Sequence, residues 1–245
     1  MRLFAPFLVM ALSLSTPMAC AEGARVAVAS NFAPIAEKLA ASYAGVSGGE
    51  VTIIGGATGK LFAQITAGAP FDAFLSADQK TVAKLAENGL ALPDSRFTYA
   101  RGQLALWTAR TEVALSDPTA ALLAASHIAI ANPDLAPYGK AAAETIEKLG
   151  LFDALSNHLV IGENIGQAQT LVASKAADLG FVAASGLADK GGSFWIVPED
   201  MHAPLLQDAI LLTRGKDNKT AIGFLHWLRG DEARAIISAA GYSVK

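Results

Sequence analysis

The sequence is short of cysteine and of charge. Its single cysteine, Cys20, has no partner for a disulfide within the chain, so burial of apolar side chains must hold the fold together. Charged residues make up 17% of the 245 residues, and 19 basic side chains stand against 22 acidic ones. This balance argues against a nucleic-acid-binding protein, which is expected to show a basic patch. A hydrophobic content of 52% argues equally against a disordered chain.

Long apolar runs are also missing, apart from one at the start. Residues 3–14 are mostly apolar, follow Arg2 and precede Ala19-Cys20-Ala21, the small-x-small form that signal peptidase recognises. The run is shorter than the roughly 20 residues that cross a bilayer, so an uncleaved membrane anchor is only the alternative. We predict a signal peptide (1–21), cleaved near Ala21, and a periplasmic mature protein. Lipid attachment at Cys20 is a further alternative, which Pro17 disfavours because an aliphatic residue is normally found there.

After residue 24 the sequence alternates short β-branched runs with windows of helical periodicity, a pattern typical of an α/β fold. The predicted strands are residues 25–29, 51–54, 73–76, 103–107, 127–130, 159–161, 179–183 and 209–212. The predicted helices are residues 32–45, 58–68, 78–89, 138–149 and 165–176, with a last helix marked by Ala221, Phe224, Leu225 and Leu228.

Two such arrays without a linker rich in proline or serine predict two lobes joined by chain crossings. We expect residues 22–102 and 203–245 to form the first lobe and residues 103–202 the second. Each lobe should be a mixed, mostly parallel sheet flanked by helices. Because ligands of open α/β sheets bind at the carboxyl ends of the strands, the site is expected in the cleft between the lobes.

Four turns between a strand and a helix are rich in small and hydroxyl residues. We name them the first to fourth turn: residues 29–32, 55–60, 132–139 and 162–167. In the first turn, Ser30 or Asn31 could simply cap the following helix. Taken together, however, four helix N-termini aimed into one cleft would provide many neutral N–H donors, which suits a small polyvalent anion.

The sequence contains partial matches to catalytic and cofactor-binding motifs, but their spacing or the predicted elements beside them do not fit those functions. The G-x-S-x-G match at residues 45–49 follows a helix and precedes a strand, the reverse of a nucleophile elbow. The second turn lacks the spacing and the Ser or Thr of a phosphate-binding P-loop, and no G-x-G-x-x-G follows the first strand. The four histidines are scattered, and Asp72 and Asp78 are interpreted as a buried contact and a helix cap. We therefore predict no enzyme, no cofactor and no direct ligands for a metal cation.

Several segments in order resemble the molybdate-binding periplasmic proteins of ABC importers, which have the two-lobe periplasmic-binding-protein fold of class II. The resemblance covers the whole mature chain. Its segments are V-A-V-A-S-N-F at 26–32, G-A-T-G-K-L at 56–61, A-G-A-P-F-D-A-F-L-S-A-D at 67–78, P-D-L-A-P-Y-G at 133–139, G-E-N-I at 162–165 and L-G-F-V at 179–182.

The resemblance implies an oxyanion held by hydroxyls and backbone amides, with no charged side chain. By position, the donors are the Ser30 hydroxyl, the Asn31 amide, the Thr58 hydroxyl and amide, the Tyr138 amide and the Ile165 amide. It also implies that the ligand is molybdate or tungstate and that the partner is a membrane permease. We expect a monomer that binds no nucleic acid.

One position departs from the pattern of the family. Many members have a tyrosine after the L-G-x-V strand whose hydroxyl reaches the anion, and here that position is Ala183. Either Tyr138 supplies the phenol instead, or one donor is missing. The departure leaves open a binding protein for sulfate, thiosulfate or a phosphonate. A periplasmic enzyme on the same scaffold is a more distant alternative, since the turns contain Lys60, Asp134 and Glu163 but no paired catalytic groups.

Overall fold

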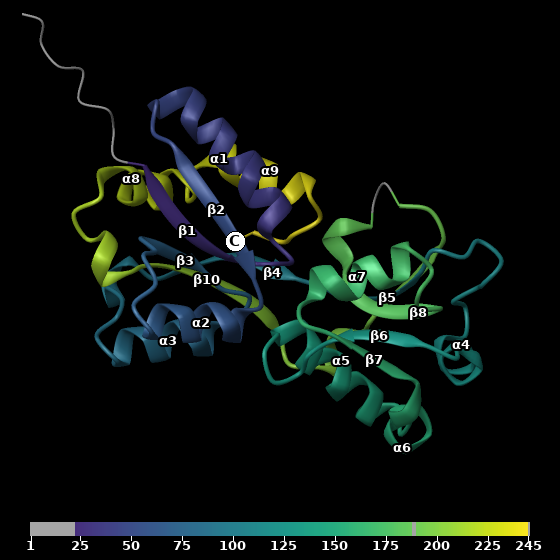
Figure 1. Cartoon of the computed structure of the whole chain (residues 1–245). Coiled ribbons are helices and arrows are strands. Elements are labelled where there is room, and N and C mark those ends of the chain that lie inside the picture. Colours follow the sequence, from purple (N-terminus) through teal and green to yellow (C-terminus); the bar gives the residue numbers. More distant parts are fainter. Residues whose placement is uncertain (1–22, 188–189, 245) are drawn as a thin grey trace, which may run out of the picture.

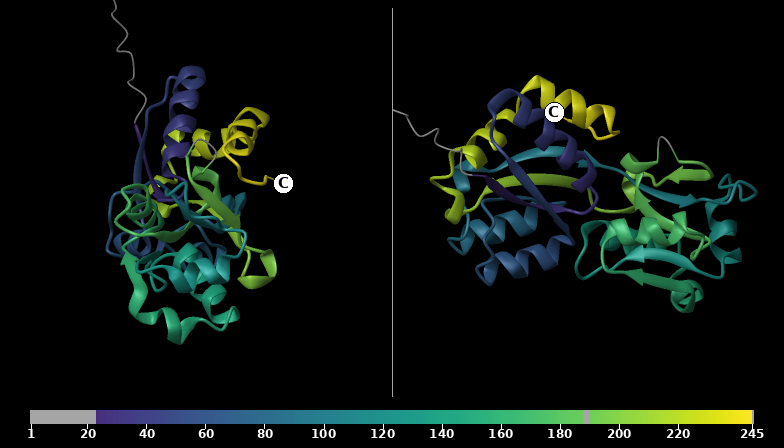
Figure 2. Two further views of the ribbon diagram at one scale, coloured as in Figure 1. Left: turned by 90° about the vertical axis from the view of Figure 1, so that its right-hand side faces the viewer. Right: turned by 45° about the horizontal axis from the view of Figure 1, so that its top comes forward.

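The computed structural model describes residues 23–187 and 190–244 and consists of two α/β lobes, each built on a five-stranded sheet (Figure 1). The right-hand view of Figure 2 shows the same division. The predicted signal peptide, residues 1–21 with Cys20, lies outside the described residues. No helix within the described residues is long and apolar enough to cross a membrane.

The sheet of the first lobe has the order β2-β1-β3-β10-β4. Its strands are β1 (Ala24–Ala29), β2 (Val51–Gly56), β3 (Ala73–Leu75), β4 (Phe97–Gly102) and β10 (Leu205–Leu211). Strand β10 is antiparallel to both β3 and β4, whereas β1 is parallel to β2 and β3. Four strands thus run in one direction and β10 opposes them, which confirms the expected mixed, mostly parallel sheet.

Helices cover both faces of this sheet. They are α1 (Ala33–Ser47), α8 (Lys219–Trp227) and α9 (Asp231–Ala239) on one face, and α2 (Thr58–Thr66) and α3 (Gln79–Glu87) on the other (Figure 1). Because successive side chains of a strand point to opposite faces, Val26 and Val28 pack beneath α1 and α8 while Ala27 packs beneath α2. Alternate side chains of β1 therefore contribute to the hydrophobic cores on the two faces of the sheet.

The second lobe repeats the same arrangement, with the order β7-β6-β8-β5-β9 and β5 as the reversed strand. Its strands are β5 (Leu104–Thr108), β6 (Ile128–Ala131), β7 (Leu159–Gly162), β8 (Leu179–Ala183) and β9 (Ser193–Ile196). Its helices are α4 (Pro118–Ala124), α5 (Pro137–Lys148), α6 (Phe152–Leu155) and α7 (Ile165–Ala173).

All eight predicted strands and all six predicted helices overlap observed elements. Helix α1 extends beyond the predicted end at Gly45 and stops at Gly48, whose left-handed backbone (φ 69°) suits glycine. Strands β4 and β9 and helices α4, α6 and α9 were not predicted. The chain passes between the sheets directly after β4 and between β9 and β10, and the lobe boundaries at single-residue level stay a prediction.

Candidate functional site

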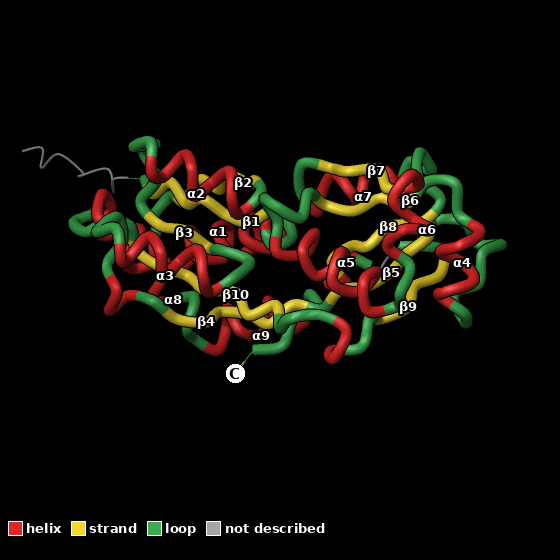
Figure 3. The backbone as a smooth tube through the Cα atoms, turned by 90° about the horizontal axis from the view of Figure 1, so that it is seen from below, coloured by secondary structure: helices red, strands yellow, loops and turns green. Residues whose placement is uncertain are grey.

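The two sheets lie at opposite ends of the molecule (Figure 3), and the turns that follow the carboxyl ends of their parallel strands come together between them. In the first lobe, the Ser30 N–H donates to the Gly56 carbonyl at 2.9 Å and joins the first turn to the second. In the second lobe, the Asn132 N–H donates to the Gly162 carbonyl at 2.7 Å and joins the third turn to the fourth. Each lobe therefore presents a linked pair of turns.

The two pairs also meet across the cleft. The Gly59 N–H of the second turn donates to the Leu135 carbonyl of the third at 2.8 Å. A Cβ placed on Gly166 in the fourth turn would lie 3.8 Å from the Cβ of Ser30 in the first. The four turns predicted from the sequence thus form a closed ring between the lobes.

The predicted backbone donors of this ring are available to a ligand. Within the described residues, the N–H groups of Asn31, Thr58, Tyr138 and Ile165 donate to no backbone carbonyl. Three of them lie in the first turns of α2, α5 and α7, where N–H groups have no partner inside the helix. The same ends bear the positive pole of the helix dipole. The ring can therefore offer four neutral donors to an anion.

The capping residues explain why these donors are free. Ala57 and Ala136 precede α2 and α5 and have no polar side chain with which to cap them. Asn164 does cap α7, but on the Gln167 N–H, which leaves the Ile165 N–H untouched. The interpretation of Ser30 or Asn31 as a helix cap is wrong, because Phe32 occupies the N-cap of α1 and forms no side-chain cap.

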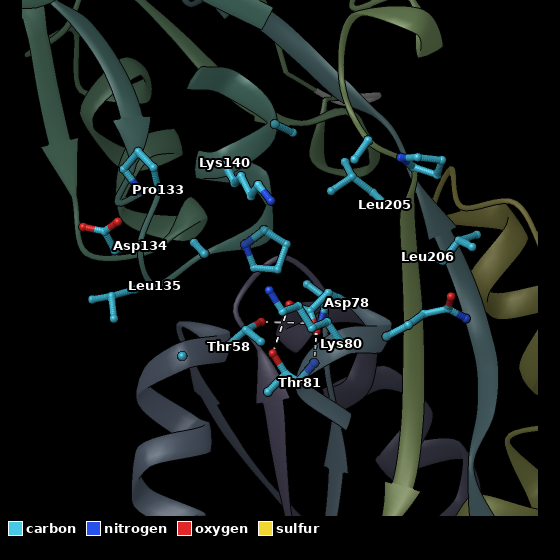
Figure 4. A pocket seen from close by; sticks show the side chains of 18 of the residues that line it. Thr58, Asp78, Lys80, Thr81, Pro133, Asp134, Leu135, Lys140, Leu205 and Leu206 are labelled. Atoms are coloured by element: carbon cyan, nitrogen blue, oxygen red, sulfur yellow. Dashed lines mark hydrogen bonds between the residues drawn. The ribbon is translucent and has the colours of Figure 1, made fainter. Parts of the chain in front are cut away.

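Thr58 faces a cleft of about 510 Å³ between the lobes. Figure 4 shows Thr58 and Asp78 from the first lobe opposite Pro133 and Lys140 from the second. The Thr58 hydroxyl accepts a long hydrogen bond of 3.4 Å from the Ala77 N–H, so its own proton remains available to a ligand. Of the predicted site residues, only Thr58 lines this cleft.

Two ion pairs lie beside the turns, and Asp134 in the third turn is exposed to solvent. Lys60 and Glu163 form an ion pair of 2.7 Å between the second and fourth turns, and both are substantially exposed. Lys140 and Glu144 approach to 3.7 Å along α5. The electrostatics of the ring are therefore those of backbone dipoles, while the charges lie in contact with solvent. No group of three or more His, Cys, Asp or Glu side chains within the described residues could hold a metal ion.

Comparison with known proteins agrees with this geometry. Residues 24–243 match the model of the bacterial extracellular solute-binding proteins. The chain belongs to this family.

Among the relatives of this solute-binding protein, the molybdate-binding protein ModA of Rhodobacter capsulatus is 42% identical over 245 residues, covering 99% of this chain and 96% of its own length. The ModA of Azotobacter vinelandii is 43% identical and covers 93% and 94%. A solved structure of the Azotobacter vinelandii periplasmic molybdate-binding protein superposes with a TM-score of 0.87 at 40% identity, covering 91% of this chain and 99% of that one.

The Tyr138 side chain of the solute-binding protein does not line the cleft. It is almost fully buried, and its hydroxyl accepts a hydrogen bond from the Gln207 amide at 3.3 Å beside Gly102. The phenol is therefore engaged within the protein, and only the Tyr138 N–H belongs to the ring. Ala183 is buried at the end of β8 and adds no hydroxyl.

Three buried residues of this region were missed in the sequence: Gln207, Tyr99 and Tyr242. The Tyr99 hydroxyl donates to Gln207 Oε1 at 3.0 Å, and the Tyr242 hydroxyl donates to the Asn31 carbonyl at 3.0 Å. The one available signal was Gln207, which with Asp208 interrupts the apolar residues of β10, because buried polar groups require partners.

Burial raises the pKa values of these tyrosines. The pKa of Tyr138 lies well above 10, first because its hydroxyl is desolvated and then because Tyr242 and Tyr99 lie nearby. The same order of causes, burial and then Tyr242, raises the pKa of Tyr99, and burial raises that of Tyr242. All three phenols are therefore neutral hydrogen-bonding groups at physiological pH.

Proposed function

We propose that this protein captures molybdate, and equally tungstate, between its two lobes and delivers it to the permease of an ABC importer. The observation that supports it most directly is the ring of four turns, with backbone N–H groups that have no backbone acceptor among the described residues. The two relatives named molybdate-binding proteins extend over nearly the whole chain at 42% and 43% identity.

Physical chemistry accounts for a site of this kind. An isolated buried dianion costs nominally tens of kcal/mol to desolvate, so many aligned donors must replace its water. Backbone N–H groups do so without a counter-ion whose own desolvation would add to the cost. Backbone N–H groups cannot accept a hydrogen bond, so a site made mainly of them disfavours hydrogen phosphate, whose O–H needs an acceptor.

Sulfate passes this chemical filter because it is a fully deprotonated tetrahedron like molybdate. Discrimination must then depend on the size of the site, since a smaller anion leaves its hydrogen bonds stretched. Molybdate and tungstate are nearly equal in size, and we expect the protein to bind both.

The proposed role needs neither a cofactor nor a catalytic residue. Of the three groups in the turns that an enzyme could use as acid or base, Lys60 and Glu163 are engaged with each other, and Asp134 has no partner group for paired catalysis among the described residues. The protein would work as a monomer outside the cytoplasm, after removal of the signal peptide near Ala21, and would bind no nucleic acid. The permease would recognise the form in which both lobes enclose the anion.

Thermal unfolding of residues 22–245 with millimolar molybdate, tungstate, sulfate or phosphate at constant ionic strength tests the proposal. A ligand at ~1,000 times its Kd adds about 4 kcal/mol, which raises Tm by several degrees. Stabilisation by molybdate and tungstate, but not by sulfate or phosphate, is the expected result. A shift with sulfate alone would replace molybdate by sulfate as the ligand. No shift with any of the four would overturn the oxyanion-binding role.

A further inference from the structure

A buried hydrogen-bond network joins the two lobes behind the ring, and Gln207 on β10 is its centre. The Gln207 Oε1 accepts hydrogen bonds from Asn31 Nδ2 at 2.9 Å and from the Tyr99 hydroxyl at 3.0 Å. The Gln207 Nε2 donates to the Tyr138 hydroxyl at 3.3 Å. All four side chains are buried, so each hydrogen bond lies in a medium of low dielectric.

Tyr242 closes the network on its other side. Its hydroxyl accepts from Asn31 Nδ2 at 2.9 Å and donates to the Asn31 carbonyl at 3.0 Å. The Tyr138 and Ser185 side chains lie beside this hydroxyl. Both protons of the Asn31 side-chain amide are thereby used. The Tyr138 hydroxyl accepts from Gln207 and keeps its own proton, which it can donate to the neighbouring Tyr242.

Tyr138 reaches this network from the opposite lobe. It belongs to the core of the second lobe, whereas Tyr99 and Tyr242 belong to that of the first. Its hydroxyl fills the space that a side chain at Gly102 would need, at the point where the chain leaves the first lobe. The Tyr138 phenol therefore extends from the second lobe and packs within the first.

The same residues hold two of the four turns. Asn31 belongs to the first turn and Tyr138 to the third, and both provide a backbone N–H to the ring. We propose that Tyr138 is a positioning residue whose phenol, through Gln207 and Tyr242, fixes the third turn against the Asn31 turn and thereby favours the closed arrangement of the lobes. This inference rests on the proposed function, because it assigns the phenol a part in retaining the oxyanion.

Removal of the Tyr138 hydroxyl leaves Gln207 Nε2 without its buried acceptor, and empties the space between Gln207 and Tyr242, only when the lobes are together. Opening of the lobes exposes these groups to water and relieves the loss. The open form is therefore favoured. From the usual cost of an unsatisfied buried group, we expect Tyr138→Phe to weaken molybdate binding by about 10- to 100-fold, chiefly through faster dissociation.

The experiment compares wild type, Tyr138→Phe and Tyr43→Phe by calorimetric titration with molybdate, with stopped-flow dissociation as a second measurement. Tyr43 is the matched control, since it is also buried and its hydroxyl donates to the Thr220 carbonyl within the first lobe, at 3.4 Å. Small-angle X-ray scattering of each variant without oxyanion reports the separation of the lobes independently of ligand affinity.

A rise in Kd of at least tenfold for Tyr138→Phe, with less than a twofold change for Tyr43→Phe, supports the inference. A Kd within twofold of wild type for Tyr138→Phe overturns it, even if Tm falls, because a purely structural role lowers stability alone. If wild type itself binds no molybdate, the proposed function fails, and scattering then decides the inference. A larger radius of gyration for Tyr138→Phe than for wild type supports it, and an equal radius overturns it.

A second variant tests the network without a substitution in α5, because local unfolding of that helix could by itself weaken binding in Tyr138→Phe. Tyr242→Phe removes from the first lobe the hydroxyl that is bonded to Asn31 and lies beside Tyr138, and we expect it to weaken binding over the same range. The double variant should lose less than the product of the two single losses, because both hydroxyls belong to one network around Asn31 and Gln207. If the increase in Kd of the double variant equalled the product of the two single increases, the result would contradict a shared network.

Discussion

Gly59 offers a test in which stability and affinity should change in opposite directions. It lies at the start of α2, and its N–H donates to the Leu135 carbonyl of the other lobe at 2.8 Å. A Cβ at this position would lie 3.2 Å from both the Cα and the carbonyl oxygen of Leu135, and 3.3 Å from its Cδ2. Its three nearest neighbours thus all belong to the second lobe, so the contact exists only when the lobes are together.

Both effects of Gly59→Ala can be assigned a magnitude. Alanine is favoured over glycine within a helix by about 1 kcal/mol, so the first lobe should gain up to that amount of stability. Overpacking of a close contact costs typically 1–3 kcal/mol, and the lower end applies because a shift of a few tenths of an ångström suffices. At about 1.4 kcal/mol per factor of ten, we expect molybdate affinity to fall about five- to tenfold.

Chemical denaturation without oxyanion and calorimetric titration with molybdate measure the two effects separately. Gly45→Ala is the matched control, because Gly45 is also helical but a Cβ there meets nothing within 4 Å. The control should gain stability and retain affinity. If Gly59→Ala gained stability while its Kd stayed that of wild type, the contact with Leu135 could not belong to the liganded state, and the reasoning would be refuted.

Three further predictions concern the ring and the network behind it. Ser30→Ala and Thr58→Ala should each weaken oxyanion binding by about 1–3 kcal/mol in calorimetry, the cost of removing a partner from a buried charged acceptor, and unchanged affinity in both would remove these hydroxyls from the site. The exposed pair of Lys60 and Glu163 should contribute little, so Lys60→Ala should raise Kd less than about fivefold at low salt and not at all in 0.5 M NaCl. Burial raises the pKa of Tyr99 above 10, so folding favours its neutral form, and its contribution to stability is constant below pH 10 and declines above it. Between pH 10 and 11, denaturation should show stability falling more steeply in wild type than in Tyr99→Phe, by up to about 1.4 kcal/mol per pH unit, and equal slopes would argue against the raised pKa.

Much of the fold and of the ring could be predicted because the signals are local. Helical periodicity placed α1 and α5 to within a few residues, and Asp78 caps α3 through the Thr81 N–H at 2.7 Å, as its position before the helix indicated. Asp72 forms the predicted buried contact, accepting from the Arg25 N–H at 2.7 Å. Free N–H groups at helix starts follow from helix geometry alone, so the turns could be located without knowledge of their partners.

The parts that could not be predicted depend on distant pairings. Strand β4 contains polar residues and is recognisable only by its register with β10, more than a hundred residues away. The bond between Asn31 and Gln207 joins residues 176 positions apart, and nothing in the sequence near either one indicates the other. The position of the Tyr138 phenol could not be predicted for the same reason. The motif predicted the role of the Tyr138 backbone N–H, but the phenol occupies the space beside Gly102, a residue distant in the sequence.

A ring made of backbone donors has a consequence for the evolution of selectivity. No single substitution, except to proline, removes a backbone N–H, so side-chain changes can alter the site only by moving the turns that present it. The positions that control those turns are small or buried: Gly59 at the contact between the lobes, Gly139 against the Ala131 carbonyl, and Tyr138 in the network of Gln207. Because the proposed function requires the size of the enclosed space to separate molybdate from sulfate, we expect selectivity to change through such packing positions sooner than through the hydroxyls of Ser30 and Thr58.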